Sequence, residues 1–193
     1  MKAIITGISG QDGYFLSQLL LSKGYEVHGI VRRNSSMTQG TVDILPDNIR
    51  DKIHIEYGDI TDVNFLMDLM HKEKPDEIYH LAAQSFVGYS FQNALSTYDV
   101  NIGGTLNICN AVRDSSPDTK LYFAATSELY GQPKETPQNE RTPFYPGVLM
   151  LCQSWLEYGQ LEHIGMRISY SCQMEYSLTM NPRLEVRNLL PGK

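Results

Sequence analysis

The residues with the clearest catalytic potential in this sequence are Thr126, Ser127 and Glu128, which form a short polar run. They follow an apolar segment at 120–125 that reads as a buried strand. A hydroxyl and a carboxylate at the end of such a strand can orient a substrate hydroxyl and move a proton. The same residues could equally cap the next helix, a role that Thr or Ser shares with a nearby Glu. The spacing alone leaves both interpretations open.

A glycine-rich turn near the N-terminus predicts a site for a dinucleotide. It has the spacing G-x-x-G-x-x-G, follows an apolar run and leads into an apolar helical pattern. Glycines permit a tight turn and let the backbone approach a pyrophosphate at a helix N-terminus. The alternative is an ordinary glycine turn, since such a pattern is weak without its context. The residues predicted to contact the cofactor here are Gly7, Ser9, Gly10, Gln11, Asp12 and Gly13.

The second predicted strand ends in basic residues, which favour NADP over NAD. Arg32 and Arg33 stand where an NAD site would place an acidic residue for the ribose hydroxyls, and Asn34 follows them. Guanidinium groups at this point suit a 2′-phosphate. The alternative is a solvated basic turn.

Two further strand ends are predicted to complete the cofactor groove, because ligands of parallel sheets bind at the carboxyl edge. After the third strand, Asp59 could accept a hydrogen bond from an adenine amino group, and Ile60 follows it. Small residues after the fourth strand would let the backbone approach the cofactor. This last group is Leu81, Ala82, Ala83, Gln84 and Ser85.

Alternating strand and helix patterns predict an α/β fold, a Rossmann-like doubly wound parallel sheet that is incomplete at its C-terminal side. Thr61 or Asp62 is expected to cap the helix that carries Phe65, Leu66 and Leu69. A polar loop is expected from the second strand to Asp51. Strands are predicted at 2–6, 25–31, 53–57, 77–83 and 120–125, and the other helices at 14–23 and 94–112.

Composition narrows the class of protein. The 193 residues suit one domain, perhaps with a fragment of a second, and 41% hydrophobic residues suffice for a core. The net charge of −6 argues against a nucleic-acid partner, and no apolar stretch is long enough to span a membrane. The N-terminus has no signal-peptide pattern, and Cys109, Cys152 and Cys172 lack metal-site spacing. We therefore expect a cytoplasmic protein.

Taken together, these motifs resemble the extended short-chain dehydrogenases/reductases, and the run Pro143-Phe144-Tyr145-Pro146 completes the likeness. Within them the sequence is similar to the GDP-mannose 4,6-dehydratase family. The resemblance implies NADP as cofactor, GDP-mannose as substrate and a homo-oligomer. It assigns Thr126 to a substrate hydroxyl, Ser127 to the lining of the site and Glu128 to proton transfer at C5. It also implies a Tyr-x-x-x-Lys pair on a helix after Pro146.

That pair is missing where the resemblance places it. The only Tyr-x-x-x-Lys spacing runs from Tyr130 to Lys134, and Pro133 between them would break the required helical turn. Read from the third base of each codon, however, 146–154 can encode Arg-Ser-Pro-Tyr-Ala-Val-Ser-Lys. The missing Tyr and Lys then fall opposite Met150 and Ser154.

We therefore interpret 1–146 as an NADP-binding Rossmann domain and 147–193 as an out-of-frame tail, with the substrate domain absent. The alternative is a divergent native C-terminus. An incomplete sheet with an exposed face predicts marginal stability, and the lost pair predicts no dehydratase turnover. Two other functions stay open, another extended nucleotide-sugar epimerase or reductase, and a non-catalytic NADP-binding module.

Overall fold

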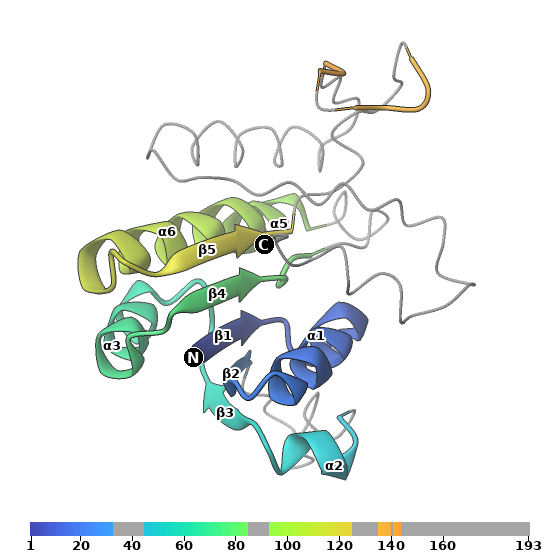
Figure 1. The fold of residues 1–193 in the computed structure, drawn as a ribbon. Helices are drawn as coiled ribbons and strands as arrows, with labels where there is room; N and C mark the ends of the chain where they lie inside the picture. The colour runs from blue at the N-terminus through green and yellow to red at the C-terminus, as the bar shows by residue number, and fades with distance from the viewer. Residues whose placement is uncertain (33–44, 85–92, 125–134, 140, 144–193) are drawn as a thin grey trace.

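The fold is a parallel β-sheet with helices on both faces (Figure 1). The computed structural model describes residues 1–32, 45–84, 93–124, 135–139 and 141–143. In this part of the chain five strands pair in the order β3-β2-β1-β4-β5, and every pairing is parallel. The strands are β1 (Lys2–Thr6), β2 (Glu26–Val31), β3 (His54–Tyr57), β4 (Glu77–His80) and β5 (Lys120–Phe123).

The order reverses between β1 and β4, which makes their carboxyl ends the topological switch point of the sheet. The predicted Rossmann-like doubly wound sheet is thus confirmed. Among the described helices, none is long and apolar enough to cross a membrane.

Side chains alternate between two apolar cores along the strands. Ala3 and Ile5 of β1 join the core under α1 (Gln11–Ser22), where Leu16 and Leu20 are buried. Ile4 points to the other face and packs under α3 (Val63–Glu73) and α6 (Gly104–Ser115). Figure 1 shows α1 on one side of the sheet, with α3 and α6 on the other. This period of two places helices on both faces.

The helix boundaries refine the sequence prediction. Helix α1 begins at Gln11 rather than at 14, because Gly10 takes an extended backbone and acts as its N-cap. Asp62 caps α3 by accepting hydrogen bonds from the N–H groups of Asn64 and Phe65. Thr61, the other predicted cap, instead donates to Asp59.

Three predicted elements are corrected. The polar loop that was expected to reach Asp51 contains a short helix, α2 (Asp47–Arg50). Strand β4 ends at His80 rather than at 83. The Leu81 N–H is shared between the Thr6 carbonyl and the Thr6 hydroxyl, and the Ala82 N–H donates to that hydroxyl. The helix predicted at 94–112 is a run of α5 (Ala94–Tyr98), a π-helical turn η2 (Asp99–Gly103) and α6.

Candidate functional site

A cavity of about 860 Å³ lies at the carboxyl edge of the sheet, where the sequence predicts the cofactor groove. It brings together nine of the predicted residues from four separate strand ends. Ile30, Val31, Gly58 and Val100 complete its wall together with Thr6. The predicted residues that line it are Gly7, Ser9, Gly10, Arg32, Asp59, Ile60, Leu81, Ala82 and Ala83.

The remaining predicted residues fall into two groups. Gln11, Asp12, Gly13 and Gln84 are described but do not line the cavity. The others lie outside the described residues: Arg33, Asn34, Ser85, Thr126, Ser127 and Glu128, as does the whole of 147–193. Their roles stay predictions.

The three glycines of the turn have three different structural roles. Gly7 adopts a positive φ of 71°, which other residues adopt at a cost, and the site of its missing Cβ is 3.0 Å from the Ala82 nitrogen. Gly10 donates to the Gly7 carbonyl at 2.9 Å and lines the cavity. At Gly13 a Cβ would lie 2.6 Å from the Gly7 oxygen and from the Ile8 Cα. Gly7 therefore permits the turn, Gly10 keeps the cavity open, and Gly13 lets the helix pack closely against the turn.

The N-terminus of α1 opens onto the cavity through Gly10. Gly10 is the N-cap of this helix and has no side chain that could accept a hydrogen bond from it. The first N–H groups of a helix lack partners within the helix, and the helix dipole adds partial positive charge there. Together with the exposed Arg32 at the end of β2, this edge suits an anionic ligand. Asp59 is the acidic lining residue, and one of its oxygens accepts from Thr61 at 2.8 and 2.9 Å.

A buried hydrogen-bond chain fixes the floor of the cavity. The Thr6 hydroxyl accepts from the Leu81 and Ala82 N–H groups at 3.1 and 3.0 Å and lies 2.8 Å from His80 Nδ1. Since Thr6 already accepts twice, its own proton goes to Nδ1, and His80 then donates from Nε2 to the Thr105 hydroxyl at 3.0 Å. Burial lowers the pKa of His80 to about 4, which keeps the ring neutral at pH 7.

Two asparagines hold the loops that border the cavity. Asn101 lies in the π-helical turn and accepts from the Gln84 N–H at 2.7 Å, while its amide donates to the Gln84 carbonyl at 3.3 Å. Asn107 donates to the carbonyls of Ile60 and Thr61, both at 3.1 Å. One helical run thus positions the segments after β3 and β4. These asparagines were not predicted as site residues from the sequence, and neither were Thr6, His80 and Thr105, because their partners are distant along the chain.

The fold and the cavity define a Rossmann-type α/β domain. Solved structures of this fold superpose closely. The UDP-glucose 4-epimerase of Bifidobacterium longum, in complex with NAD⁺ and UDP, has a TM-score of 0.76 at 22% identity, covering 87% of this chain and 51% of the epimerase. The UDP-glucose 4-epimerase of Brucella ovis, in complex with NAD, has a TM-score of 0.73 at 23% identity, covering 86% of this chain and 50% of the epimerase. Such low identity supports the fold alone.

Sequence comparison identifies the family. The family model described as GDP-mannose 4,6 dehydratase matches residues 4–148. The GDP-mannose 4,6-dehydratase of Yersinia enterocolitica is 44% identical over 180 residues, covering 89% of this chain and 48% of the relative. The human GDP-mannose 4,6 dehydratase is 47% identical over 164 residues, covering 80% of this chain and 44% of the human protein. The chain belongs to the GDP-mannose 4,6 dehydratase family, and it spans about half the length of the curated relatives it matches.

Proposed function

We propose that this chain is the NADP-binding part of a GDP-mannose 4,6-dehydratase. The observation that carries the proposal is the cavity at the switch point, lined by the glycine turn and Arg32 in a chain whose family is established. The N-terminus of α1 at Gly10 would receive the pyrophosphate, and Asp59 would accept from the adenine amino group. These donors and the room available fit a dinucleotide.

NADP rather than NAD is proposed because of the charge at the end of β2. Arg32 lines the cavity at the point where NAD sites carry an acidic group for the ribose hydroxyls. A guanidinium there would pair with the 2′-phosphate through charge-assisted hydrogen bonds. Arg33 and Asn34 follow it in sequence and are proposed to share this role.

Fluorescence titration with NADPH and NADH tests this preference. We expect NADPH to bind at least tenfold more tightly than NADH, and Arg32→Ala to remove most of that difference by weakening NADPH alone. Arg113→Ala is the matched control, because it removes the same charge from an exposed site on α6. Equal affinity for both nucleotides, or equal weakening of both by Arg32→Ala, would refute the NADP assignment.

The proposed reaction is the dehydration of GDP-mannose to the 4-keto-6-deoxy sugar. NADP, when bound, would accept the hydride that leaves C4 and provide the hydride that C6 receives, so the cofactor would be unchanged overall. The net change would be the loss of one water, with C4 oxidised to a ketone and C6 reduced to a methyl group. Glu128 is proposed to remove the C5 proton, Thr126 to orient the substrate hydroxyl and Ser127 to line the site. Strand β5 ends at Phe123, and the Ala124 N–H donates to the His80 carbonyl at 3.1 Å beside the cavity floor. In the sequence, Thr126, Ser127 and Glu128 begin two residues after Ala124.

We further propose that the chain as written does not turn over GDP-mannose, because 147–193 replaces the segment with the Tyr-x-x-x-Lys pair. The family match ends at residue 148, just beyond Pro146, which supports a change of reading frame there. The alignment with the Yersinia enterocolitica relative covers 89% of the chain and therefore extends beyond residue 148 into the tail. The DNA sequence is therefore the measurement that decides whether the reading frame changes.

Resequencing around the Pro146 codon, followed by a product assay, tests both parts. We expect no product from the chain as written and 4-keto-6-deoxy product from a gene with the reading frame restored. Turnover by the unaltered chain would refute the proposed inactivity. NADPH binding without turnover in the restored protein would instead favour a non-catalytic NADP-binding module. Turnover of another nucleotide sugar would favour the epimerase or reductase alternative.

A further inference from the structure

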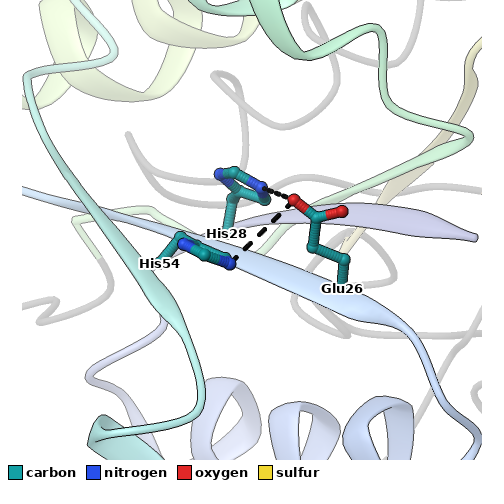
Figure 2. Close-up of side chains that lie close together, drawn as sticks. All are labelled: Glu26, His28 and His54. Atoms are coloured by element: carbon teal, nitrogen blue, oxygen red, sulfur yellow. Dashed lines mark hydrogen bonds and ion pairs between the residues drawn. The ribbon is translucent and has the colours of Figure 1, made fainter.

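A cluster of imidazole and carboxylate side chains lies at the amino ends of β2 and β3, at the other end of these strands from the cofactor cavity. Glu26 and His28 come from β2, and His54 from β3, directly opposite His28 in the strand register. Figure 2 shows both imidazoles turned toward the same Glu26 carboxylate. The His28 and His54 Nε2 atoms are 3.0 and 3.9 Å from Glu26 Oε1.

The His28 ring has the surroundings of an oriented metal ligand. Its side chain is only 4% exposed, and its Nδ1 lies 3.3 Å from Glu56 Oε1. A carboxylate on one ring nitrogen holds the proton there, which leaves the lone pair of the other nitrogen available for a metal. In His28 that other nitrogen is Nε2, which lies 3.0 Å from Glu26 Oε1 and 3.6 Å from Glu73 Oε2. A metal ion bound there would take the place of the proton that these carboxylates attract.

The spacing of these three groups is close to that of a tetrahedral site. Zinc binds nitrogen and carboxylate oxygen at about 2.0 to 2.2 Å, so neighbouring ligand atoms lie roughly 3.3 to 3.5 Å apart. The distances of 3.0 and 3.9 Å bracket this value. The two rings are stacked at 4.7 Å, so His54 must turn to direct its lone pair at a shared ion. Its side chain is 60% exposed and has room to do so.

We propose that Glu26, His28 and His54 form a binding site for a divalent transition metal, with zinc the best match and water as the fourth ligand. Two imidazoles and one carboxylate are a donor set that zinc accepts, whereas calcium and magnesium prefer oxygen alone. The ion would join the amino ends of β2 and β3 and so stabilise the sheet there.

The lysines near the cluster leave room for a cation. Lys2 and Lys72 both make their shortest ion pairs with Glu73, at 2.6 and 2.8 Å. Hydrogen bonds from Lys2, which has the larger effect, and from Lys72 lower the pKa of Glu73 to about 2. Lys2 lies farther from Glu26, at 3.5 Å. The cluster's carboxylates outnumber its ammonium groups by three to two, which favours a bound cation. The carboxylates are Glu26, Glu56 and Glu73, and the ammonium groups are those of Lys2 and Lys72.

Calorimetric titration of the whole chain with ZnCl2 at pH 7.5 tests the site. All proteins would carry Cys152→Ser and Cys172→Ser, so that these thiolates cannot bind the ion. We expect one zinc per chain, a rise in melting temperature with zinc, and at least tenfold weaker binding at pH 5.5, because protons compete for imidazole. Glu26→Gln and His54→Ala should each weaken binding about 10- to 100-fold. The side chains of Glu26 and His54 are 48% and 60% exposed, so neither substitution opens a buried cavity.

His71→Ala is the matched control, since it removes an exposed histidine from α3 outside the cluster. It should bind zinc as the parent does. Absence of 1:1 binding by the parent, or binding that His54→Ala leaves unchanged, would overturn the proposal and show that the cluster is an ion-pair network only. Equal weakening by His71→Ala would overturn it too, because binding would then be adventitious. Since NADPH titration reports the other edge of the sheet, these outcomes are independent of the proposed function.

Discussion

Replacing Gly13 with alanine separates helix propensity from packing, because the two effects have opposite signs. Alanine is favoured over glycine within a helix by up to about 1 kcal/mol, so propensity alone predicts a more stable protein. At Gly13, however, a Cβ would lie 2.6 Å from the Gly7 oxygen and the Ile8 Cα. These are backbone atoms of the turn, and relieving such overpacking typically costs about 1 to 3 kcal/mol. We expect Gly13→Ala to destabilise the chain by about 1 to 2 kcal/mol.

Urea unfolding followed by circular dichroism measures this change. With a slope of about 2 kcal/mol per molar urea, the midpoint should fall by roughly 0.5 to 1 M. NADPH affinity should fall as well, because the displaced turn lines the cavity. Gly103→Ala is the control, since a Cβ there meets no atom within 4 Å, and it should leave the protein equally or more stable. A Gly13→Ala protein at least as stable as the parent, with unchanged slope, would refute the packing argument.

Three further predictions concern buried or capping groups. Asn101→Ala should weaken NADPH binding and lower stability by about 1 to 3 kcal/mol, measured by titration and urea unfolding, because both Gln84 backbone groups lose their partner. His80 has a pKa of about 4 when folded and near 6.5 when unfolded, so its contribution is complete above pH 6.5. Stability should therefore fall by roughly 3 kcal/mol as pH drops from 6.5 to 4, and His80→Gln should remove this component. Asp62→Ala should cost about 1 kcal/mol in urea unfolding through the lost cap of α3, and no change would contradict that role.

Local chemistry in the sequence is enough to predict most of the sheet. The alternation of apolar strands with helical patterns predicts all five described strands, with ends that differ by no more than three residues. Gly24 ends α1 with a φ of 76°, and Asp62 caps α3, as their residue types lead one to expect. Each of these features depends on neighbours within a few residues, so the sequence contains the whole cause.

The candidate site was predictable in part for the same reason. Gly7, Arg32 and Asp59 follow predicted strands, and the rule that parallel strands end at one edge brings them to one cavity. The rule does not say which glycine packs against the backbone of the turn and which glycines line the cavity. Only the structure shows that Gly13 is needed for close packing rather than for contact with the cavity.

What the sequence alone determined is thus the order of elements, the switch-point groove and the family resemblance, since these rest on residue types at short spacing. The tertiary structure decided which distant groups meet. The pairing of Thr6 with His80 and of Asn101 with Gln84 depends on strand order and on a π-helical turn. The gathering of two histidines around Glu26 likewise follows from the β2–β3 register, because side chains far apart along the chain become neighbours only across a paired sheet.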